Sequence, residues 1–459
     1  MADTTLFCRR ALLPDGWAHN VRLRISATGM LQEVTPDCRQ HVGENAGIVV
    51  PGMPNAHSHA FQRAMAGLAE HRTSSADSFW TWRDTMYWFA DRIQPDDLQR
   101  IAAQVYVEML KGGFTSVAEF HYLHHQPDGT PFANPATLSM SLLDAAAHVG
   151  IGQTLLPVLY VGANFGEHRP APAQRRFVNS PDRLLAILAS CRRYLPAPNQ
   201  QRVGLALHSL RAVPEDAANE VLAGLNEVSP GSPVHIHVAE QTAEVDNCFK
   251  WSGQRPVKWL LEHLPVDEQW CLVHATHINA EELAGIVESG AVVGLCPTTE
   301  ANLGDGLFPL RSFLDADGQL AVGSDSNVSV SVTEELRWLE YGQRLRHQSR
   351  NVSADKRTPH TGEALFTRAL AGGRQALGQA VGRLERGFRA DLLVLDDTSP
   401  LLANTPDHAL LDSLVFAGNQ PLVRDVMVAG RWCVRDFRHH AEASIRADYN
   451  RTVKRLRQL

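Results

Sequence analysis

Two histidines separated by a single residue, His57 and His59, follow an apolar stretch typical of a β-strand, Ile48-Val49-Val50. Alternate side chains of a strand lie on the same face, so both imidazoles point the same way from the strand end. Two imidazoles placed in this way can bind one metal ion. Two surface histidines near a turn produce the same pattern, so this pair alone does not establish a metal site, and the rest of the chain must support it.

Three further apolar stretches end in polar residues that could do chemistry. The stretch from Pro233 reaches His237, and Glu240 follows three residues later. His274 and Asp325 end two later stretches of the same kind. Four strands that all end in this way are improbable by chance. The remaining histidines near these ends are expected to be ordinary hydrogen-bonded core or rim residues: His235, His263 and His277.

The residue types predict a metal centre for hydrolysis. Three neutral imidazoles and one carboxylate suit a borderline divalent ion such as zinc, with water in the open position. The ion lowers the pKa of its bound water towards about 7 and so supplies hydroxide at neutral pH. We expect Asp325 both to bind the ion and to accept the proton of the water. The predicted metal ligands are His57, His59, His237 and Asp325.

Two further residues are predicted to be catalytic. Glu240 lies past its strand end, where it can reach over a substrate and carry a proton to the leaving nitrogen. His274 can orient the hydroxide or stabilise the tetrahedral intermediate from the neighbouring strand. The stretch Arg202 to Ser209 contains no lysine that could bridge two ions. We therefore expect one divalent ion per chain.

The elements that must position these residues alternate regularly from residue 48 onward. Amphipathic helices, Gly- or Pro-marked turns and short apolar strands repeat about eight times, which predicts an α/β fold with a closed (β/α)8 TIM-like barrel. Functional groups of such barrels lie at the carboxyl ends of the strands. An open doubly wound sheet is the alternative, but the strand count and the absence of a phosphate-binding glycine fingerprint favour the barrel. The expected strands are 48–51, 115–120, 153–160, 202–208, 233–239, 270–274, 291–296 and 320–325.

The two ends of the chain have a different pattern. Residues 1–47 and 385–459 contain short alternating strands and turns, which predicts one small β-sandwich domain built from both ends. The catalytic domain, residues 48–384, would then be inserted into the small domain.

Composition excludes several classes of protein. The 459 residues carry a net charge of -7, which argues against a general affinity for nucleic acid or anionic membranes. Seven scattered cysteines without a Cys-x-x-Cys pair indicate reduced thiols and a cytoplasmic protein. The N-terminal segment lacks the apolar core of a signal peptide, and no apolar run is long enough to span a membrane.

With these motifs the chain resembles the amidohydrolase superfamily, in its deaminase branch. The resemblance rests on His57-Ser-His59, His237-Val-Ala-Glu240, His274 and Ser324-Asp325, and it covers essentially the whole chain. It implies a distorted barrel with a small sandwich domain, and a homodimer. Longer runs are most similar to the enzymes of the branch that hydrolyse N-formimino-L-glutamate to N-formyl-L-glutamate and ammonia, in histidine degradation. These runs are residues 57–65, 77–83, 119–125, 208–211 and 296–304.

A substrate with two carboxylates requires cations in its pocket, and arginine offers the matching fork geometry. Arg83 lies in an aromatic loop expected at residues 79–89, and Arg211 lies just beyond the fourth strand. The resemblance adds Gln62, Tyr122 and His208 as substrate-binding residues. A residue in the stretch after Asp325 could complete the pocket, but the sequence does not identify it.

Other functions remain open at this point. A deaminase of a purine, a triazine or a guanidino acid would use the same metal machinery, but a neutral heterocycle leaves no role for two arginines. A non-catalytic scaffold would be expected to lack some ligands or the proton shuttle, whereas every group is present here. The metal could be iron or manganese instead of zinc.

Overall fold

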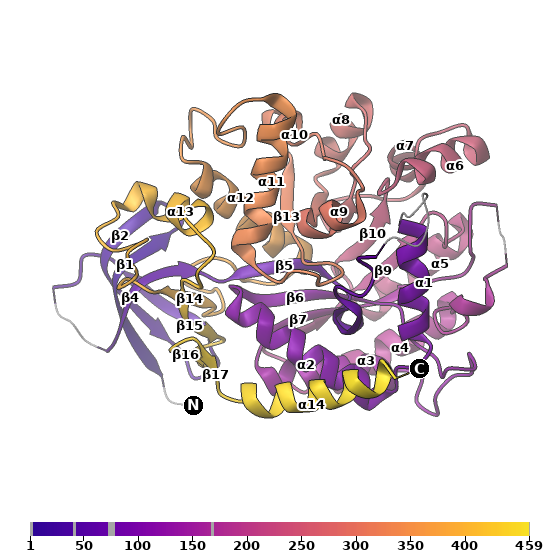
Figure 1. Ribbon diagram of the computed structural model, residues 1–459, viewed down its shortest axis with the longest axis horizontal. Coiled ribbons are helices and arrows are strands. Elements are labelled where there is room, and N and C mark those ends of the chain that lie inside the picture. The colour runs from indigo at the N-terminus through magenta and orange to yellow at the C-terminus, as the bar shows by residue number, and fades with distance from the viewer. Residues whose placement is uncertain (1–2, 40–42, 72–78, 167–168, 459) are drawn as a thin grey trace.

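Eight parallel strands form a barrel (Figure 1) in the computed structural model, which describes residues 3–39, 43–71, 79–166 and 169–458. Hydrogen bonds from the amides of Ser324 and Asp325 to the carbonyl of His57 bring the last strand against the first. This arrangement confirms the predicted barrel. The strands are β5 (Met53–Ser58), β6 (Phe114–His121), β7 (Gly152–Leu159), β9 (Leu205–Ser209), β10 (Val234–Val238), β11 (Trp270–His274), β12 (Val292–Leu295) and β13 (Gln319–Val322), and a short β8 (Gln201–Val203) also pairs with β7.

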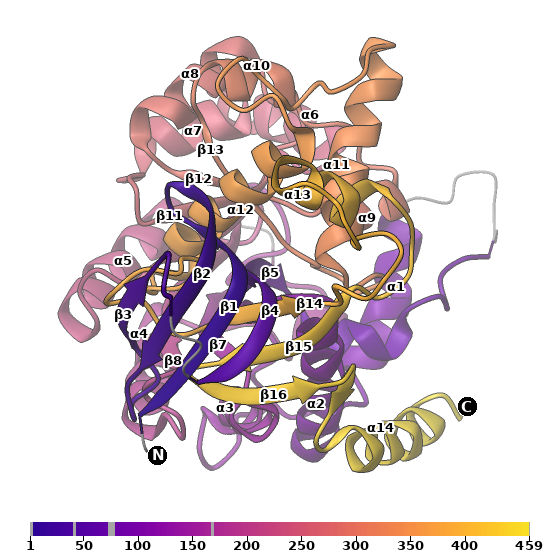
Figure 2. The same cartoon turned by 90° about the vertical axis from the view of Figure 1, so that its left-hand side faces the viewer.

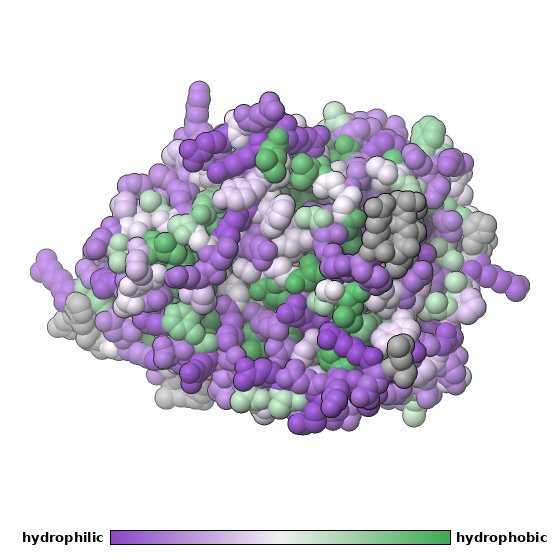
Figure 3. All heavy atoms as spheres, in the orientation of Figure 1, coloured by the Kyte–Doolittle hydropathy of each residue, from purple (hydrophilic) through white to green (hydrophobic). Residues whose placement is uncertain are grey.

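Helices surround the barrel, and local signals set their ends. Ser180 caps one helix by accepting a hydrogen bond from the amide of Arg183. Gly150 and Gly290 end two others in the left-handed conformation that glycine adopts without strain. Hydrophilic side chains cover most of the face in Figure 3, as expected for amphipathic helices that bury one side. The helices are α2 (Pro95–Lys111), α3 (Thr137–Val149), α4 (Pro181–Tyr194), α5 (Glu215–Val228), α6 (Thr242–Ser252), α7 (Pro256–His263), α8 (Ala280–Ser289), α9 (Pro297–Leu303), α10 (Leu310–Asp315), α11 (Val332–His347) and α12 (Thr361–Leu377).

Strands from both ends of the chain form a second sheet beside the barrel (Figure 2). The two ends meet where β14 pairs antiparallel with β4, with Val394 opposite Val49. The strands predicted as a sandwich are joined in one continuous sheet with an apolar core of its own. Its order is β17 (Arg438–His439), β16 (Arg431–Arg435), β15 (Val423–Val428), β14 (Leu392–Leu395), β4 (Glu44–Pro51), β1 (Thr4–Leu13), β2 (Gly16–Ile25) and β3 (Leu31–Thr35).

The stretch expected as the first barrel strand, residues 48–51, belongs to this second sheet instead. Strand β4 ends at Pro51, and β5 of the barrel begins at Met53. Only Gly52 separates them, and a Cβ there would lie 2.2 Å from Thr115 Cγ2. The chain passes from one sheet to the other without a turn, so the sequence shows one apolar run where the structure has two strands. The domain division at residues 47/48 and 384/385 stays a prediction.

Three helices lie where strands or a loop were expected. The aromatic loop is helix α1 (Phe79–Ala90), and the C-terminal flank contains α13 (Asp407–Phe416) and α14 (Glu442–Leu456). Helix α14 is rich in charge and is fixed to α2 partly by an ion pair between Lys111 and Glu442, at 2.8 Å. Helix α14 has few apolar residues, so the sequence shows too weak a helical periodicity to predict it. Among the described residues, no helix combines the length and the apolar character needed to cross a bilayer.

Candidate active site

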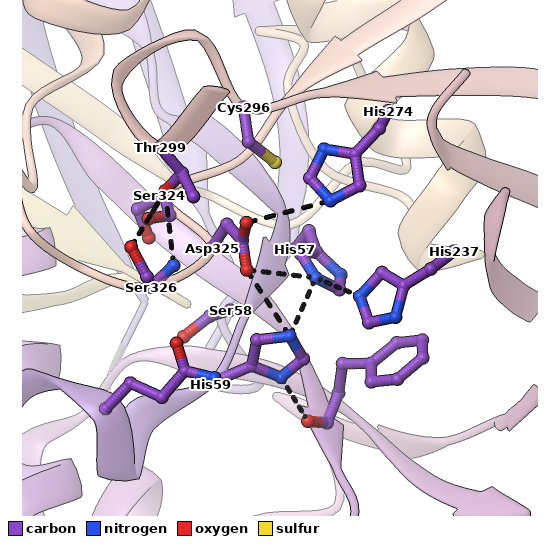
Figure 4. Close-up of polar contacts among 12 residues, drawn as sticks. His57, Ser58, His59, His237, His274, Cys296, Thr299, Ser324, Asp325 and Ser326 are labelled. Atoms are coloured by element: carbon purple, nitrogen blue, oxygen red, sulfur yellow. Dashed lines mark hydrogen bonds and ion pairs between the residues drawn. The ribbon is translucent and has the colours of Figure 1, made fainter. Parts of the chain in front are cut away.

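Four side chains converge at the carboxyl rim of the barrel (Figure 4). His57 lies in β5 and His59 just after it, His237 lies in β10, and Asp325 follows β13. Nε2 of His57 lies 3.1 Å from Nε2 of His59 and 3.0 Å from Nε2 of His237. Oδ1 of Asp325 lies 3.4 Å from Nε2 of His57 and 3.3 Å from Nε2 of His59. The structure thus brings the four predicted metal ligands together.

The spacing of these atoms fits a single bound cation. Ligands about 2.0 Å from a tetrahedral ion lie about 3.3 Å from one another. Nε2 of His57 can donate at most one proton and cannot satisfy His59, His237 and Asp325 at once, whereas a shared cation would. Nδ1 of His59 lies 2.8 Å from the carbonyl of Phe120, so a proton there leaves the Nε2 lone pair free for a metal.

The protonation states also suit metal ligands, which must be neutral imidazoles or an ionised carboxylate. Burial lowers the pKa of His59 to about 3 and lowers those of His57 and His237 as well. Burial alone would raise the pKa of Asp325, but the hydrogen bond with His57 holds it well below its usual range. A second cluster of possible ligands, His274, Cys296 and Asp325, fits less well because burial raises the pKa of the Cys296 thiol.

The loop that carries Asp325 is held in an unusual backbone conformation. The backbone φ angle of Asp325 is +43°, in the left-handed region that non-glycine residues seldom adopt. Asn55 donates to Ser324 Oγ at 2.7 Å, and Ser324 Oγ donates in turn to Asn327 at 2.7 Å. Asn327 also donates to the carbonyl of Asp325 at 3.0 Å. This buried network stabilises a conformation that aims the carboxylate at the histidines.

The two predicted catalytic residues lie beside the cluster. Nε2 of His274 is 3.7 Å from Oδ2 of Asp325 and 3.9 Å from Oε1 of Glu240. Burial raises the pKa of Glu240 to about 7, so the group can both accept and donate a proton near neutrality. Burial would lower the pKa of His274, but Glu240, Glu300 and Asp325 outweigh it and raise that pKa to about 10.

Glu300, on α9, was not among the predicted site residues. Its Oε1 lies 3.2 Å from Nδ1 of His274 and accepts the amide of Cys296 at 2.9 Å. The carboxylate therefore orients the ring so that Nε2 faces Asp325 and Glu240. One sequence signal could have identified Glu300: it is an acidic residue one turn into a helix that directly follows a barrel strand.

Replacement of Glu300 by glutamine is expected to lower kcat/KM by about 10–100-fold, because a reacting group held less firmly loses up to about 10²-fold in rate. Glutamine keeps the size but removes one of the three negative charges that raise the pKa of His274. Metal content should not change. The measurement is steady-state kinetics beside metal analysis, with the exposed Glu220→Gln on α5 as control. Equal kcat/KM in wild type and Glu300→Gln would remove Glu300 from this role.

The pocket beside the cluster is lined by His59, His237 and Asp325 and by all five residues predicted to bind substrate: Gln62, Arg83, Tyr122, His208 and Arg211. Gln62, on η1 (Ala60–Met65), donates to Tyr122 Oη at 2.8 Å. The pKa of His208 lies well below its ordinary value because of burial and then Arg211, with a further contribution from Arg83. Both guanidinium groups therefore act on the same pocket. Six aromatic and apolar residues complete the wall, and none of them was predicted to bind substrate: Trp82, Met86, Tyr87, Tyr160, Phe177 and Leu303.

The histidines expected to be ordinary core or rim residues lie away from the cluster. His235 contacts the carbonyl of Ala376 at 2.8 Å, on the helix side of β10. His263 stacks on Trp259 with ring centroids 4.4 Å apart. His277 contacts the carbonyl of Asp305 at 2.8 Å.

Comparison with known proteins gives consistent matches over nearly the whole chain. Residues 48–433 match the amidohydrolase family, and residues 3–47 match the N-terminal domain of formimidoylglutamate deiminase HutF. The chain is 54% identical to a formimidoylglutamate deiminase of Pseudomonas aeruginosa over 96% of both proteins. A crystal structure of an amidohydrolase from Brucella melitensis superposes with a TM-score of 0.93 at 45% identity, over 99% of both chains. A zinc-bound adenosine deaminase from Xanthomonas campestris has a TM-score of 0.82 at 20% identity, over 99% of this chain and 98% of that chain.

Proposed function

Because the chain belongs to the amidohydrolase family, we propose that its pocket hydrolyses N-formimino-L-glutamate to N-formyl-L-glutamate and ammonia, as a formimidoylglutamate deiminase of histidine degradation. The identity of 54% with such an enzyme over 96% of the chain supports this assignment. The single observation that carries it is the placement of Arg83 and Arg211 in the same pocket as the histidine cluster.

We propose one divalent ion per chain, zinc, held by the four converging side chains His57, His59, His237 and Asp325. The choice of zinc is supported by the donor set and by the zinc in the adenosine deaminase of the same fold. When bound, such an ion supplies Lewis acidity that makes water a nucleophile at neutral pH.

The side chains around the cluster can move the protons that the reaction needs. Asp325 accepts a proton as water adds to the formimino carbon. His274, protonated and 3.7 Å from Asp325, donates a hydrogen bond that orients the water and stabilises the negative charge that develops. Glu240, protonated, gives one proton to the terminal nitrogen as water adds across the C=N bond, and it regains one from Asp325. Glu240 then protonates the same nitrogen again, the C–N bond breaks and ammonia leaves, while the hydroxyl proton of the tetrahedral intermediate returns to Glu240. The balance is one water consumed and one ammonia released for each formyl group formed.

The two arginines discriminate this substrate from a neutral heterocycle. A guanidinium holds a carboxylate through two parallel hydrogen bonds, a pairing that a neutral heterocycle cannot offer. Burial of most of the other pocket residues, including Tyr122, Tyr160 and Glu240, strengthens such a pairing.

Release of ammonia from N-formimino-L-glutamate, measured beside N-formimino-L-aspartate, guanine and adenosine, tests the function. Turnover is expected for the glutamate derivative, and Arg211→Ala should lower kcat/KM by roughly 30-fold or more, since loss of one partner of a buried charge pair costs about 2–5 kcal/mol. The surface Arg183→Ala on α4 serves as control. Turnover of guanine or adenosine instead would assign the pocket to a heterocycle deaminase.

We also propose that the enzyme works in the cytoplasm as a homodimer. All seven cysteines are free, which suits a reducing compartment. Three large side chains, Trp338, Tyr341 and Leu345, are exposed along α11, and Leu345 is 78% exposed. Such a face suits contact with a second copy of the chain. Light scattering of the purified protein measures the mass, and a monomer would refute the dimer.

A further inference from the structure

A buried glutamine joins two walls of the pocket. Gln174 is 3% exposed and ends η2 (Pro172–Gln174), in the segment between β7 and α4. Its Nε2 donates to Tyr160 Oη at 2.7 Å and to Tyr87 Oη at 3.1 Å. Its Oε1 accepts the amide of Ala171 at 2.8 Å. Both amide hydrogens and the amide oxygen are therefore used, and the side chain has a single well-defined position.

Each tyrosine contacts a residue that the proposed function places on the substrate. The guanidinium carbon of Arg83 lies 5.5 Å from the centroid of the Tyr87 ring, within cation–π range. The Tyr160 ring is edge-on to His208, with centroids 4.6 Å apart. Gln174 thus connects Arg83 on one wall with His208 on the other, through one tyrosine on each side.

The two walls come from separate parts of the chain. Tyr87 and Arg83 lie four residues apart on α1, so they share one face of that helix. Tyr160 directly follows the barrel strand β7. Phe177 fills the space between the tyrosines, with its ring centroid 6.0 Å from Tyr87 and 5.9 Å from Tyr160. Phe177 adds apolar packing, which has little directional preference. The hydrogen bonds of the Gln174 amide are directional and fix where the hydroxyls of Tyr87 and Tyr160 lie.

We propose that Gln174 is a positioning residue for carboxylate recognition: by joining Tyr87 to Tyr160 it holds α1 against the barrel and so fixes Arg83 over the bound substrate. This inference rests on the proposed function. An arginine side chain is flexible in isolation, and a guanidinium fixed beforehand loses less entropy when a carboxylate binds. Gln174 contacts none of the four residues of the metal cluster, so its loss should affect substrate binding more than the chemical step.

The expected signature is a rise in KM without an equal fall in kcat. Gln174→Leu keeps the approximate size and removes both donors. It should raise KM for N-formimino-L-glutamate by about 10–100-fold, the range expected when a binding group is displaced, while kcat stays within about threefold. Metal content should match wild type. Tyr87→Phe removes one hydroxyl only and should raise KM in the same direction by a smaller factor, so it serves if Gln174→Leu folds poorly.

A double-mutant cycle tests whether Gln174 acts through Arg83. If it does, Gln174→Leu should add little once Arg83 is replaced by alanine, and the effects of the two changes on KM should be far from multiplicative. Gln126→Leu is the matched control, because the side-chain amide of Gln126 donates to Thr130 and Pro131 of its own loop. The control should keep the KM of wild type.

The outcomes separate this inference from the proposed function. Wild type that fails to hydrolyse N-formimino-L-glutamate overturns the function and the inference with it. Active wild type with unchanged KM in both Gln174→Leu and Tyr87→Phe overturns the inference alone. Fully multiplicative effects in the cycle, or a fall in kcat and metal content without a change in KM, also overturn it.

Discussion

Glu240→Gln is expected to lower kcat by about 10²–10⁴-fold, the usual contribution of a positioned proton-transfer group. The glutamine side chain has nearly the same shape but can neither accept nor release the proton that the leaving nitrogen needs. The pKa of about 7 makes Glu240 suited to this task, because neither protonation state is strongly favoured at neutral pH. Metal content should be unchanged, since Glu240 lies outside the four-residue cluster.

The measurement is single-turnover and steady-state ammonia release, with metal analysis of the same sample. Glu288→Gln, at an exposed position of α8, is the matched control and should retain full activity. A small change in KM beside the large fall in kcat would identify an interaction made in the transition state. A Glu240→Gln enzyme within tenfold of wild-type kcat would rule out the proton-shuttle role.

The cluster could be predicted from sequence because strand geometry links spacing to direction. His57 and His59 are two residues apart, so a strand places them on one face, and the carboxyl ends of parallel barrel strands meet at one rim. His237 and Asp325 are far apart in the sequence, but each follows an apolar strand pattern, and this is enough to place them at the same rim. The resemblance to a family supplied Gln62, Tyr122 and His208, which spacing alone does not identify.

The positioning residues could not be predicted in this way because they act across elements with no fixed spacing. Glu300 and its partner His274 are 26 residues apart, on a short helix and a strand. Gln174 reaches Tyr87 over 87 residues. Burial and hydrogen-bond partners decide the role of such residues, and a local signal, such as the position of Glu300 one turn into its helix, does not identify the partner. The boundary at Gly52 was missed for a related reason, since one apolar run continues through two sheets.

Asp325→Asn is expected to reduce both metal affinity and turnover, in contrast to Glu240→Gln. The variant removes the negative charge from the ligand set and leaves three neutral imidazoles to hold a dication. Residues that only hydrogen-bond to a metal ligand already contribute about 10–100-fold to metal affinity. Loss of the ligand carboxylate itself should therefore weaken metal binding by at least about 10²-fold. Turnover should fall further, because the same carboxylate accepts the proton of the water.

Metal-dependent stabilisation gives a second readout that does not depend on activity. An ion present at about 1,000 times its dissociation constant stabilises the folded chain by about 4 kcal/mol, and a 10²-fold weaker site loses about 2.7 kcal/mol of this. Zinc should therefore raise the melting temperature of Asp325→Asn much less than that of wild type or of the exposed control Asp315→Asn. Equal metal content and equal zinc-dependent stabilisation in Asp325→Asn would exclude Asp325 as a ligand. Its contacts with His57 and His59 would then reflect hydrogen bonding within the apoprotein, and the ion would have to be held by the histidines alone.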